Sequence, residues 1–477
     1  MIDFEIQFIS GATSGGFFMQ DNNKKFTLWL LAWPIFIELF LQLMLGAADT
    51  LMVSKISDEA VAVVGFSNQI FYALTLLIMT VASGAGILIA QMIGAKKEQD
   101  ARTIAIMTVN VSVMIGLILS VFLYTKPLVI VQWLQLPDSL LPMAEIYISI
   151  VGAGMVLTSL MLALSTVIRN TGNTRGPMYT AIAMNIVHVF LNYAFIFGAF
   201  GFPEWGLTGV AISTVISRLF ATIMLLVMFV NSFENKIGFK DLRLFNMKLF
   251  KDVMKIGWPL GVSNSAYMIA QLVLFSFIAV IGAEELATRT YLNTLESFCF
   301  MLGYSIALAV QIQIAHLYGA GRTREAYASA YRALWIAIVL AIINAIIILV
   351  FGKQLLGLFS NNSNIIILGV SMLGLNLILQ TGKSLNMVVG GALNAVGDTR
   401  YTMIVSVCCQ LLITVVMSYW LGVYLGWGLL GIYVAMITDE YVRGFLAFYR
   451  WRGRKYLYRV ERAERRKLEA HTTTQLE

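Results

Sequence analysis

The stretch LAWPIFIELFLQLMLGAADTLMVSKIS, at residues 31–57, decides the class of fold. It is largely apolar, and its ionisable residues are Glu38, Asp49 and Lys55. It exceeds the run of about 20 residues that a helix needs to cross a hydrocarbon layer of about 30 Å. Its pattern lacks the strict polar–apolar alternation of a barrel strand, and a helix pairs its backbone amides internally. The stretch therefore predicts a membrane-spanning helix, which we place near residues 27–53.

The composition of the whole chain agrees with this interpretation. Of 477 residues, 59% are hydrophobic and 12% are charged, and the mean hydropathy is +0.79. These values are typical of a chain whose main solvent is lipid. We predict an all-α membrane protein with twelve transmembrane helices, near residues 27–53, 60–93, 103–125, 140–168, 177–199, 207–232, 253–281, 286–317, 328–351, 365–394, 401–422 and 429–449.

The basic residues predict how these helices are oriented. Most Lys and Arg residues precede the first helix, lie in the even-numbered loops or follow the last helix, whereas the odd-numbered loops hold Lys55, Lys126 and Lys353. By the positive-inside rule, we expect a multi-pass protein of the inner (plasma) membrane with both termini in the cytoplasm. This topology also explains the net charge of +7, so we do not expect nucleic acid as a partner.

An internal repeat relates the two halves of the chain at one constant displacement, the one that takes Trp33 to Trp258. Without any gap, this displacement aligns Trp33-Pro34 with Trp258-Pro259, Gly94-Ala95 with Gly319-Ala320, and TGNTR at 171–175 with VGDTR at 396–400. With six helices in each repeat, both halves enter the membrane in the same orientation, as in parallel-repeat transporters. We therefore expect two homologous six-helix lobes, related by a pseudo-two-fold axis along the membrane normal, with the substrate path between them.

The predicted domains follow from the repeat. They are an N-terminal tail at 1–23, an N-lobe at 24–232, a cytoplasmic linker at 233–252, a C-lobe at 253–449 and a basic cytoplasmic tail at 450–477.

Cysteine and histidine usage argues against an enzyme. The three cysteines, Cys299, Cys408 and Cys409, lie in apolar segments, and the three histidines, His188, His316 and His471, are scattered. Neither set has the spacing of a metal site, and the glycine turns are not followed by the Lys-Ser/Thr of a phosphate-binding loop. We expect no cofactor, no metal site and no direct use of nucleotide.

Several motifs resemble those of the multidrug and toxic compound extrusion (MATE) family. In the first half they are the stretch at 31–57, VAVVGFSNQI, ILIAQMIGA and NTGNTRGPMYTAIAMNI, and in the second half IGWPLGVSNSAYMIAQ, AHLYGAGRTREA and GGALNAVGDTR. The resemblance covers roughly residues 25–450. It implies a V-shaped, monomeric antiporter that gives antibiotic resistance by expelling cationic or zwitterionic amphipathic drugs against an inward flow of H⁺ or Na⁺. The alternative is a lipid-linked oligosaccharide flippase of the same superfamily, which should line its cavity with several cations.

Four polar residues of the first half are candidates for the ion-coupling site. Asp49, Asn192 and Thr214 are expected at one depth in the outer part of the lobe, and His188 lies one turn from Asn192 on the same helix face. Ionisable groups within hydrocarbon are costly, and a carboxylate among neutral polar groups can hold H⁺ or a small hard cation such as Na⁺. The resemblance likewise places the coupling residues of the family at Asp49, Asn192 and Thr214. The alternative is a set of interhelical hydrogen bonds that serves packing alone.

Other ionisable residues are candidates for the substrate cavity or for gating. Glu38 shares a helix face with Asp49 and either lines the cavity or pairs internally, and Glu296 lies near the middle of its helix. The sodium-binding branch of the family has an acid where this chain has Lys383, so proton coupling is favoured over sodium coupling. Lys383 either pairs with Glu296 or titrates in place of the ion. For Asp439, Glu440 and Arg443, we favour ion pairing inside the protein.

Overall fold

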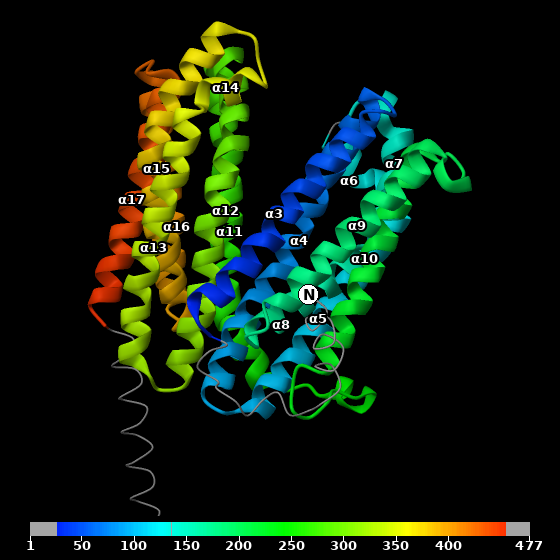
Figure 1. The fold of residues 1–477 in the computed structure, drawn as a ribbon, viewed down its shortest axis with the longest axis vertical. Helices are drawn as coiled ribbons and strands as arrows, with labels where there is room; N and C mark the ends of the chain where they lie inside the picture. Colours follow the sequence, from blue (N-terminus) through cyan, green and yellow to red (C-terminus); the bar gives the residue numbers. More distant parts are fainter. Residues whose placement is uncertain (1–25, 135, 455–477) are drawn as a thin grey trace, which may run out of the picture. The chain divides into compact units, whose positions relative to one another are not determined.

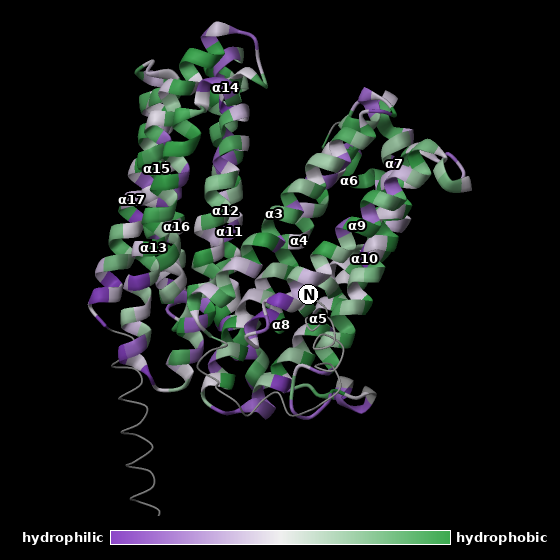
Figure 2. Cartoon of the chain, in the orientation of Figure 1, coloured by the Kyte–Doolittle hydropathy of each residue, from purple (hydrophilic) through white to green (hydrophobic). Residues whose placement is uncertain are grey.

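The structure is a computed structural model that describes residues 26–134 and 136–454. These residues form helices joined by turns (Figure 1), and apolar residues run along most of the helix lengths (Figure 2). Ten of the described helices are long and apolar enough to cross a membrane, or eleven spans if one bent helix pair is counted as a span. An all-α membrane protein is thus confirmed. The predicted tail at 1–23 and residues 455–477 of the other tail lie outside the described residues.

The chain divides into two compact units. Unit 1 comprises Met1–Ile78 and Lys97–Phe250, and unit 2 comprises Met79–Lys96 and Lys251–Glu477. The helix α4 (Asp58–Gly94) passes from the first unit into the second. The second half of α4 is therefore part of the compact unit built mainly by the second repeat.

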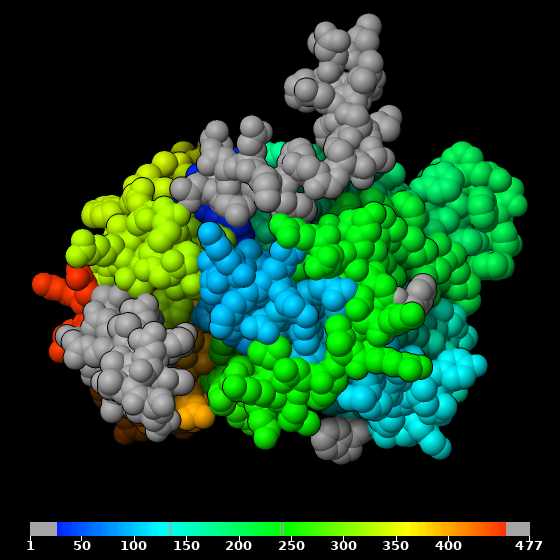
Figure 3. All heavy atoms as spheres, turned by 90° about the horizontal axis from the view of Figure 1, so that it is seen from below, coloured from blue at the N-terminus to red at the C-terminus, as the bar shows by residue number. Residues whose placement is uncertain are grey.

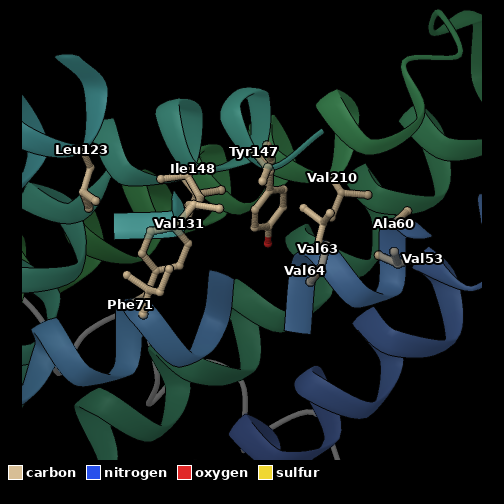
Figure 4. Close-up of a cluster of buried hydrophobic side chains, with 14 of the residues drawn as sticks. Val53, Ala60, Val63, Val64, Phe71, Leu123, Val131, Tyr147, Ile148 and Val210 are labelled. Carbon is tan, nitrogen blue, oxygen red and sulfur yellow. The ribbon is translucent and has the colours of Figure 1, made fainter. Parts of the chain in front are cut away.

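Unit 1 contains most of the first repeat. Besides the first part of α4, its elements are α3 (Leu28–Val53), α5 (Glu98–Thr125), α6 (Pro127–Trp133), η1 (Asp138–Leu140), α7 (Leu141–Ala153), α8 (Met155–Asn170), α9 (Arg175–Phe197), η2 (Ala199–Gly201), α10 (Gly206–Val230) and η3 (Phe239–Arg243). Its core is a cluster of apolar side chains from several of these helices, including Phe71, Ile148 and Val210 (Figure 4).

Unit 2 contains the second repeat. Its elements are α11 (Met247–Ile281), α12 (Ala283–Gly319), α13 (Thr323–Val350), α14 (Gly352–Gly357), α15 (Ser363–Ala395), α16 (Thr399–Cys409), η4 (Gln410–Met417), η5 (Tyr419–Tyr424) and α17 (Gly428–Arg452). The helix α15 packs against α12, α13 and α17, and a second apolar cluster, which includes Leu274, Leu292 and Tyr433, forms the core.

The single helix predicted at 140–168 is wrong, because α7 and α8 meet at Gly154 with a bend of 44°. Beyond the bend, the backbone N–H of Val156 donates to the hydroxyl of Ser120, at 2.8 Å. A side chain of α5 thus satisfies a donor near the start of α8, where the first turn of a helix has no internal acceptors. This tertiary contact lies beside the bend, and helical periodicity does not reveal it.

The helix predicted at 401–422 also differs, since it is α-helical up to Cys409 and continues as the π-helices η4 and η5. Long π-helical runs are rare, and those that occur are frequently at functional sites. The buried side chains of η4 are Gln410 and Thr414.

The described helix α17 has 25 residues, and it is not among the ten membrane-crossing candidates. It carries Asp439, Glu440 and Arg443 within its length, and these three side chains are buried. Charges inside a span are costly unless they are paired within the protein. The helix is therefore less apolar than the other long helices, since it contains the charged residues whose ion pairs are described below.

The ends of α4 and α12 cross within unit 2 at two glycines that the repeat equates. A Cβ atom added to Gly94 would lie 2.0 Å from the carbonyl oxygen of His316, and one added to Gly319 would lie 1.9 Å from that of Gln91. The displacement that takes Gly94 to Gly319 also takes Gln91 to His316. The contact is thus made twice, once from each repeat, as a two-fold relation between two segments requires.

The segment after α10 packs on the start of α5. The side chain of Arg102 forms an ion pair with Asp241 of η3 and also donates to the carbonyl of Lys236, at 3.2 Å. Figure 3 shows the two segments, light blue and green, side by side on this face. The first part of the predicted linker at 233–252 is thus held against unit 1.

Candidate functional site

The structure brings Asp49 of α3 together with two residues of α9. The Oδ1 atom of Asp49 lies 2.7 Å from His188 Nε2 and accepts a hydrogen bond from Asn192 Nδ2 at 2.8 Å. Since α9 places His188 and Asn192 one turn apart, Nδ2 and Nε2 are themselves only 3.1 Å apart. The carboxylate therefore faces two nitrogen-bearing side chains.

Burial makes this cluster chemically distinctive. His188 and Asn192 are 2% and 0% exposed, whereas the Asp49 side chain is 22% exposed. The carbonyl oxygen Oδ1 of Asn192 is buried and has no hydrogen-bond partner among the described residues. Buried polar groups are normally hydrogen-bonded, so this oxygen is an acceptor left open beside the Asp49 carboxylate.

The helix α10 supports the cluster from behind. Ser217 Oγ lies 3.0 Å from His188 Nδ1 and donates to the carbonyl oxygen of Thr214, also at 3.0 Å. The hydroxyl of Thr214 donates to the carbonyl of Val210 at 2.9 Å. Thr214 thus contacts the cluster through Ser217. Its own hydroxyl donates to Val210 and not to Asp49.

Two ionisable residues that the sequence analysis did not place at the site lie close to it. Tyr147 of α7 interacts with the side chain of Thr214, and both Tyr147 and Arg218 are in electrostatic contact with Asp49. The guanidinium of Arg218 donates to Thr158 Oγ1 of α8 at 2.9 Å. Figure 4 shows that the ring of Tyr147 points away from its own helix into the unit. Ser217 and Arg218 follow Thr214 by about one turn, a spacing that could have revealed them.

Glu38 lies apart from this cluster and pairs with a basic residue. Its Oε1 lies 3.4 Å from Arg169 Nη2 of α8, and its side chain is 7% exposed. Internal pairing, one of the two roles expected for Glu38, is therefore present.

In unit 2, Glu296 of α12 is surrounded by donors. Its Oε1 accepts from Arg289 Nη1 at 3.0 Å and from the hydroxyl of Tyr433 at 2.6 Å. The ammonium of Lys383 lies 3.8 Å from Oε2. Lys383 thus makes the ion pair hypothesised for it, and its part in transport stays a prediction.

Arg289 is the residue of this second cluster that sequence reasoning missed. It is 2% exposed and also donates to the hydroxyl of Tyr433, at 2.9 Å. Arg289 and Glu296 lie two turns apart on one helix, which puts them on the same face. A buried arginine within a predicted span needs a partner, and this spacing identifies Glu296 as the candidate.

The ion pairing predicted on α17 is confirmed. Arg443 pairs with Asp439 and, at 3.1 Å, with Oε1 of Glu440, whose other oxygen accepts from Asn386 at 2.8 Å. These three charged residues and Lys383 line one pocket together with Tyr267, Ala270, Gln271, Gln410, Thr414 and Met436. The polar side chains of the π-helix η4 thus face the charges of α17.

Comparison with known proteins identifies the family. The MatE family model matches residues 34–194 and 259–420, two segments whose first residues, Pro34 and Pro259, are equivalent in the repeat. The chain is 32% identical over 435 residues to the uncharacterized transporter YisQ of Bacillus subtilis, covering 91% of this chain and 96% of YisQ. It is 28% identical to the probable multidrug resistance protein NorM of Thermotoga maritima, covering 87% of this chain and 89% of NorM.

The fold agrees with these matches. A MATE crystal structure in the bent conformation superposes with a TM-score of 0.82 at 19% identity, covering 90% of this chain and 94% of that one. The described helices therefore have the architecture of solved MATE proteins. Because the family model matches most of the length of both repeats, the chain belongs to the MATE family of membrane transporters and is not an enzyme.

Proposed function

We propose that this protein is a secondary-active antiporter that exports cationic or zwitterionic amphipathic drugs in exchange for H⁺. Asp49 binds the coupling proton, and His188 and Asn192 hold its carboxylate. The name of the Thermotoga relative, a probable multidrug resistance protein, supports drugs as the substrate class. The relative that is 32% identical is uncharacterized, so the substrates themselves need to be measured.

The observation that carries the proposal is the contact between the Asp49 carboxylate and the His188 imidazole, at 2.7 Å. A carboxylate and an imidazole are the side chains that exchange protons at moderate pH. The partial exposure of Asp49 provides a route for the proton, while the burial of His188 and Asn192 holds the pair in place.

The charges of the second unit support H⁺ over Na⁺ as the coupling ion. Glu296 already faces the fixed cations Arg289 and Lys383, and Asp439 and Glu440 both pair with Arg443. Two basic side chains offset the charge of Glu296, which leaves it little charge to attract a free cation, whereas Arg443 offsets only one of the two charges of Asp439 and Glu440. We therefore place coupling in the first unit.

The topology belongs to the same proposal. Twelve spans, two six-helix lobes and cytoplasmic termini follow if the bent pair α7–α8 and the charged helix α17 both cross the inner membrane. The pairing of the charges of α17 inside the protein reduces the cost of placing this helix in lipid. We expect the monomer to be the transporting unit.

The test is transport of a fluorescent organic cation into proteoliposomes under an imposed pH gradient or an imposed Na⁺ gradient. Uptake driven by the pH gradient, and its loss in Asp49→Asn, is the expected result. Asp58→Asn, at the exposed start of α4, is the matched control and should transport normally. Uptake driven by Na⁺ alone, or undiminished proton coupling in Asp49→Asn, would refute the proposed site.

A further inference from the structure

The hydrogen bonds next to the Asp49–His188 contact determine where hydrogens lie in it. The hydroxyl of Ser217 donates its single hydrogen to the carbonyl oxygen of Thr214, at 3.0 Å. His188 Nδ1 lies 3.0 Å from the same hydroxyl oxygen. A hydroxyl has one hydrogen to give, so when both hydrogen bonds are formed Ser217 is the acceptor toward the ring, and Nδ1 carries a hydrogen.

This hydrogen has a consequence for the other ring nitrogen. A neutral imidazole has one N–H group, so Nε2 would face Asp49 Oδ1 as a bare acceptor at 2.7 Å. Two acceptors at this distance repel each other, and a hydrogen between them turns the contact into a strong hydrogen bond. The amide of Asn192 lies to one side of both atoms: its Nδ2 donates to Oδ1 at 2.8 Å and lies 3.1 Å from Nε2, toward which its second hydrogen can point.

We propose that Ser217 holds His188 in its Nδ1–H form, so that the Asp49–His188 contact carries one proton in this conformation and is disrupted when that proton leaves. The inference rests on the proposed coupling role of Asp49 and deepens it. Ser217 becomes a positioning residue, and H⁺ becomes the ion that fits the site.

The proton inventory balances in both states. With the proton, the pair is an imidazolium and a carboxylate, or a neutral imidazole and a carboxylic acid, and its net charge is zero in either form. When the proton leaves to water past the partly exposed Asp49, a carboxylate and a neutral imidazole remain, with the lone pair of Nε2 facing Oδ1. The resulting repulsion acts between α3 and α9, and it couples proton release to movement of α3.

The neighbouring groups agree with this assignment. Among ionisable groups, Tyr147 of α7 and Arg218 of α10 are in electrostatic contact with Asp49. The polar atoms described within hydrogen-bonding distance of Oδ1 are two nitrogens, whereas Na⁺ prefers several oxygen ligands.

The direct test is nitrogen NMR of the full-length protein labelled with ¹⁵N-histidine in nanodiscs, titrated with acid and base. The chain has three histidines, so the His188 signals are identified by their loss in His188→Gln. We expect Nδ1 to stay protonated across the titration while Nε2 gains and loses its hydrogen. A wild-type His188 that is protonated on Nε2 and bare on Nδ1 at alkaline pH would overturn the inference.

Ser217→Ala provides the second test. Without the hydroxyl, the neutral ring is free to carry its hydrogen on Nε2 and donate it to the Asp49 carboxylate, so the contact survives loss of the proton. We expect a shift of His188 to the Nε2–H form and a loss of uptake driven by the pH gradient, with Ser217→Thr retaining the wild-type behaviour. Ser213→Ala is the matched control, because Ser213 is also buried on α10 but bonds to the carbonyl of Gly209.

The outcomes separate this inference from the proposed function. If wild-type uptake does not respond to a pH gradient, the proposed function fails, while the NMR result still decides the state of the His188 ring. If uptake is proton-driven and Ser217→Ala keeps both the wild-type ring signals and the wild-type coupling, the role of Ser217 is refuted and the proposed function stands.

Discussion

The Asp49 cluster of unit 1 and the Glu296 cluster of unit 2 are each built around one carboxylate, and they differ in what compensates its charge. Asp49 faces a titratable imidazole and a neutral amide, and its side chain is 22% exposed. Glu296 faces the cations Arg289 and Lys383, and its side chain is 3% exposed. The carboxylate of the first cluster therefore faces an imidazole and an amide, whereas that of the second faces two basic side chains, so the second cluster has one more positive than negative charge.

The repeat shows that neither cluster is a copy of the other. In the register that aligns Trp33 with Trp258, Asp49 corresponds to Leu274 and Glu296 corresponds to Phe71, and both of these counterparts are buried core residues. The crossing of Gly94 and Gly319, in contrast, is the same from both repeats. The two repeats therefore keep their close backbone packing and differ in their buried polar chemistry.

The largest effect on stability is expected from Glu296→Gln. Loss of this carboxylate leaves the buried Arg289 and the partly buried Lys383 without their counter-charge, and breaking a buried ion pair on one side costs about 3–5 kcal/mol. Thermal unfolding in detergent should show a large decrease of the melting temperature. Glu284→Gln, at the exposed start of the same helix, should change it little, and equal effects of the two substitutions would contradict a structural role for Glu296.

A smaller loss is expected from Gly319→Ala at the crossing that both repeats share. The added Cβ atom would lie 1.9 Å from the carbonyl oxygen of Gln91, so α4 and α12 must move apart. Forcing extra atoms into a tightly packed contact costs about 1–3 kcal/mol. Gly94→Ala should have a similar effect because the contact is reciprocal. Gly65→Ala, whose Cβ atom would meet nothing within 4 Å, should not lower the melting temperature.

Asp49→Asn should have a still smaller effect on stability. An asparagine keeps an oxygen that can accept from Asn192, so the expected loss is about 0.5–1.5 kcal/mol, as for one hydrogen bond. Proton-driven uptake should nevertheless disappear. If Asp49→Asn unfolded at as low a temperature as Glu296→Gln, Asp49 would be mainly structural, and the contrast between the two units would be lost.

The smallest effect is expected at Asp241, outside the membrane-spanning helices. The hydrogen bond from the backbone N–H of Gly238 is the main cause that lowers the pKa of this carboxyl below its ordinary value of 3.8. The positive charge of Arg102 lowers it further. A lowered pKa in the folded state means that the stabilisation is present above the ordinary value and is lost as the pH falls through the folded value. The protection of the Gly238 amide, which is its hydrogen-exchange rate compared with that of an unstructured amide at the same pH, should therefore decrease only below about pH 4.

Asp241→Asn removes this titration and separates it from that of the Asp49–His188 pair. The protection of the Gly238 amide in this variant should be lower than in the wild type at neutral pH and should no longer change in acid. Proton-driven uptake should stay unchanged. A change in the pH profile of uptake would show that Asp241 contributes to coupling.

Much of the candidate site could be predicted from the sequence. Asp49 is a carboxylate within an apolar span, and the helical spacing of His188 and Asn192 puts both on one face of another candidate helix. The pairing of Arg443 with Asp439 and Glu440 follows from the same spacing rule. These predictions succeeded because they depend on local helix geometry and on the cost of isolated charges in lipid.

Contacts between distant segments could not be obtained in this way. Three features depend on which helices are neighbours. They are the electrostatic contacts of Tyr147 and Arg218 with Asp49, the bend at Gly154 and the π-helix η4. A pattern that repeats every three to four residues identifies a helix face, but it does not identify the partner of that face. The sequence analysis accordingly placed one helix near 140–168 and one near 401–422 without locating the bend and the π-helix that the structure has there.

The sequence by itself determined that this protein is a helical membrane protein with two related halves, because apolar length and a repeated register are properties of the linear chain. The tertiary structure decided which side chains surround each of these two carboxylates. Asp49 and Glu296 are both carboxylates within long apolar helices. The neighbouring helix α9 brings an imidazole to Asp49, whereas α15 brings Lys383 to Glu296, which already has Arg289 on its own helix. Electrostatic energy falls steeply with distance, so this choice is made by packing.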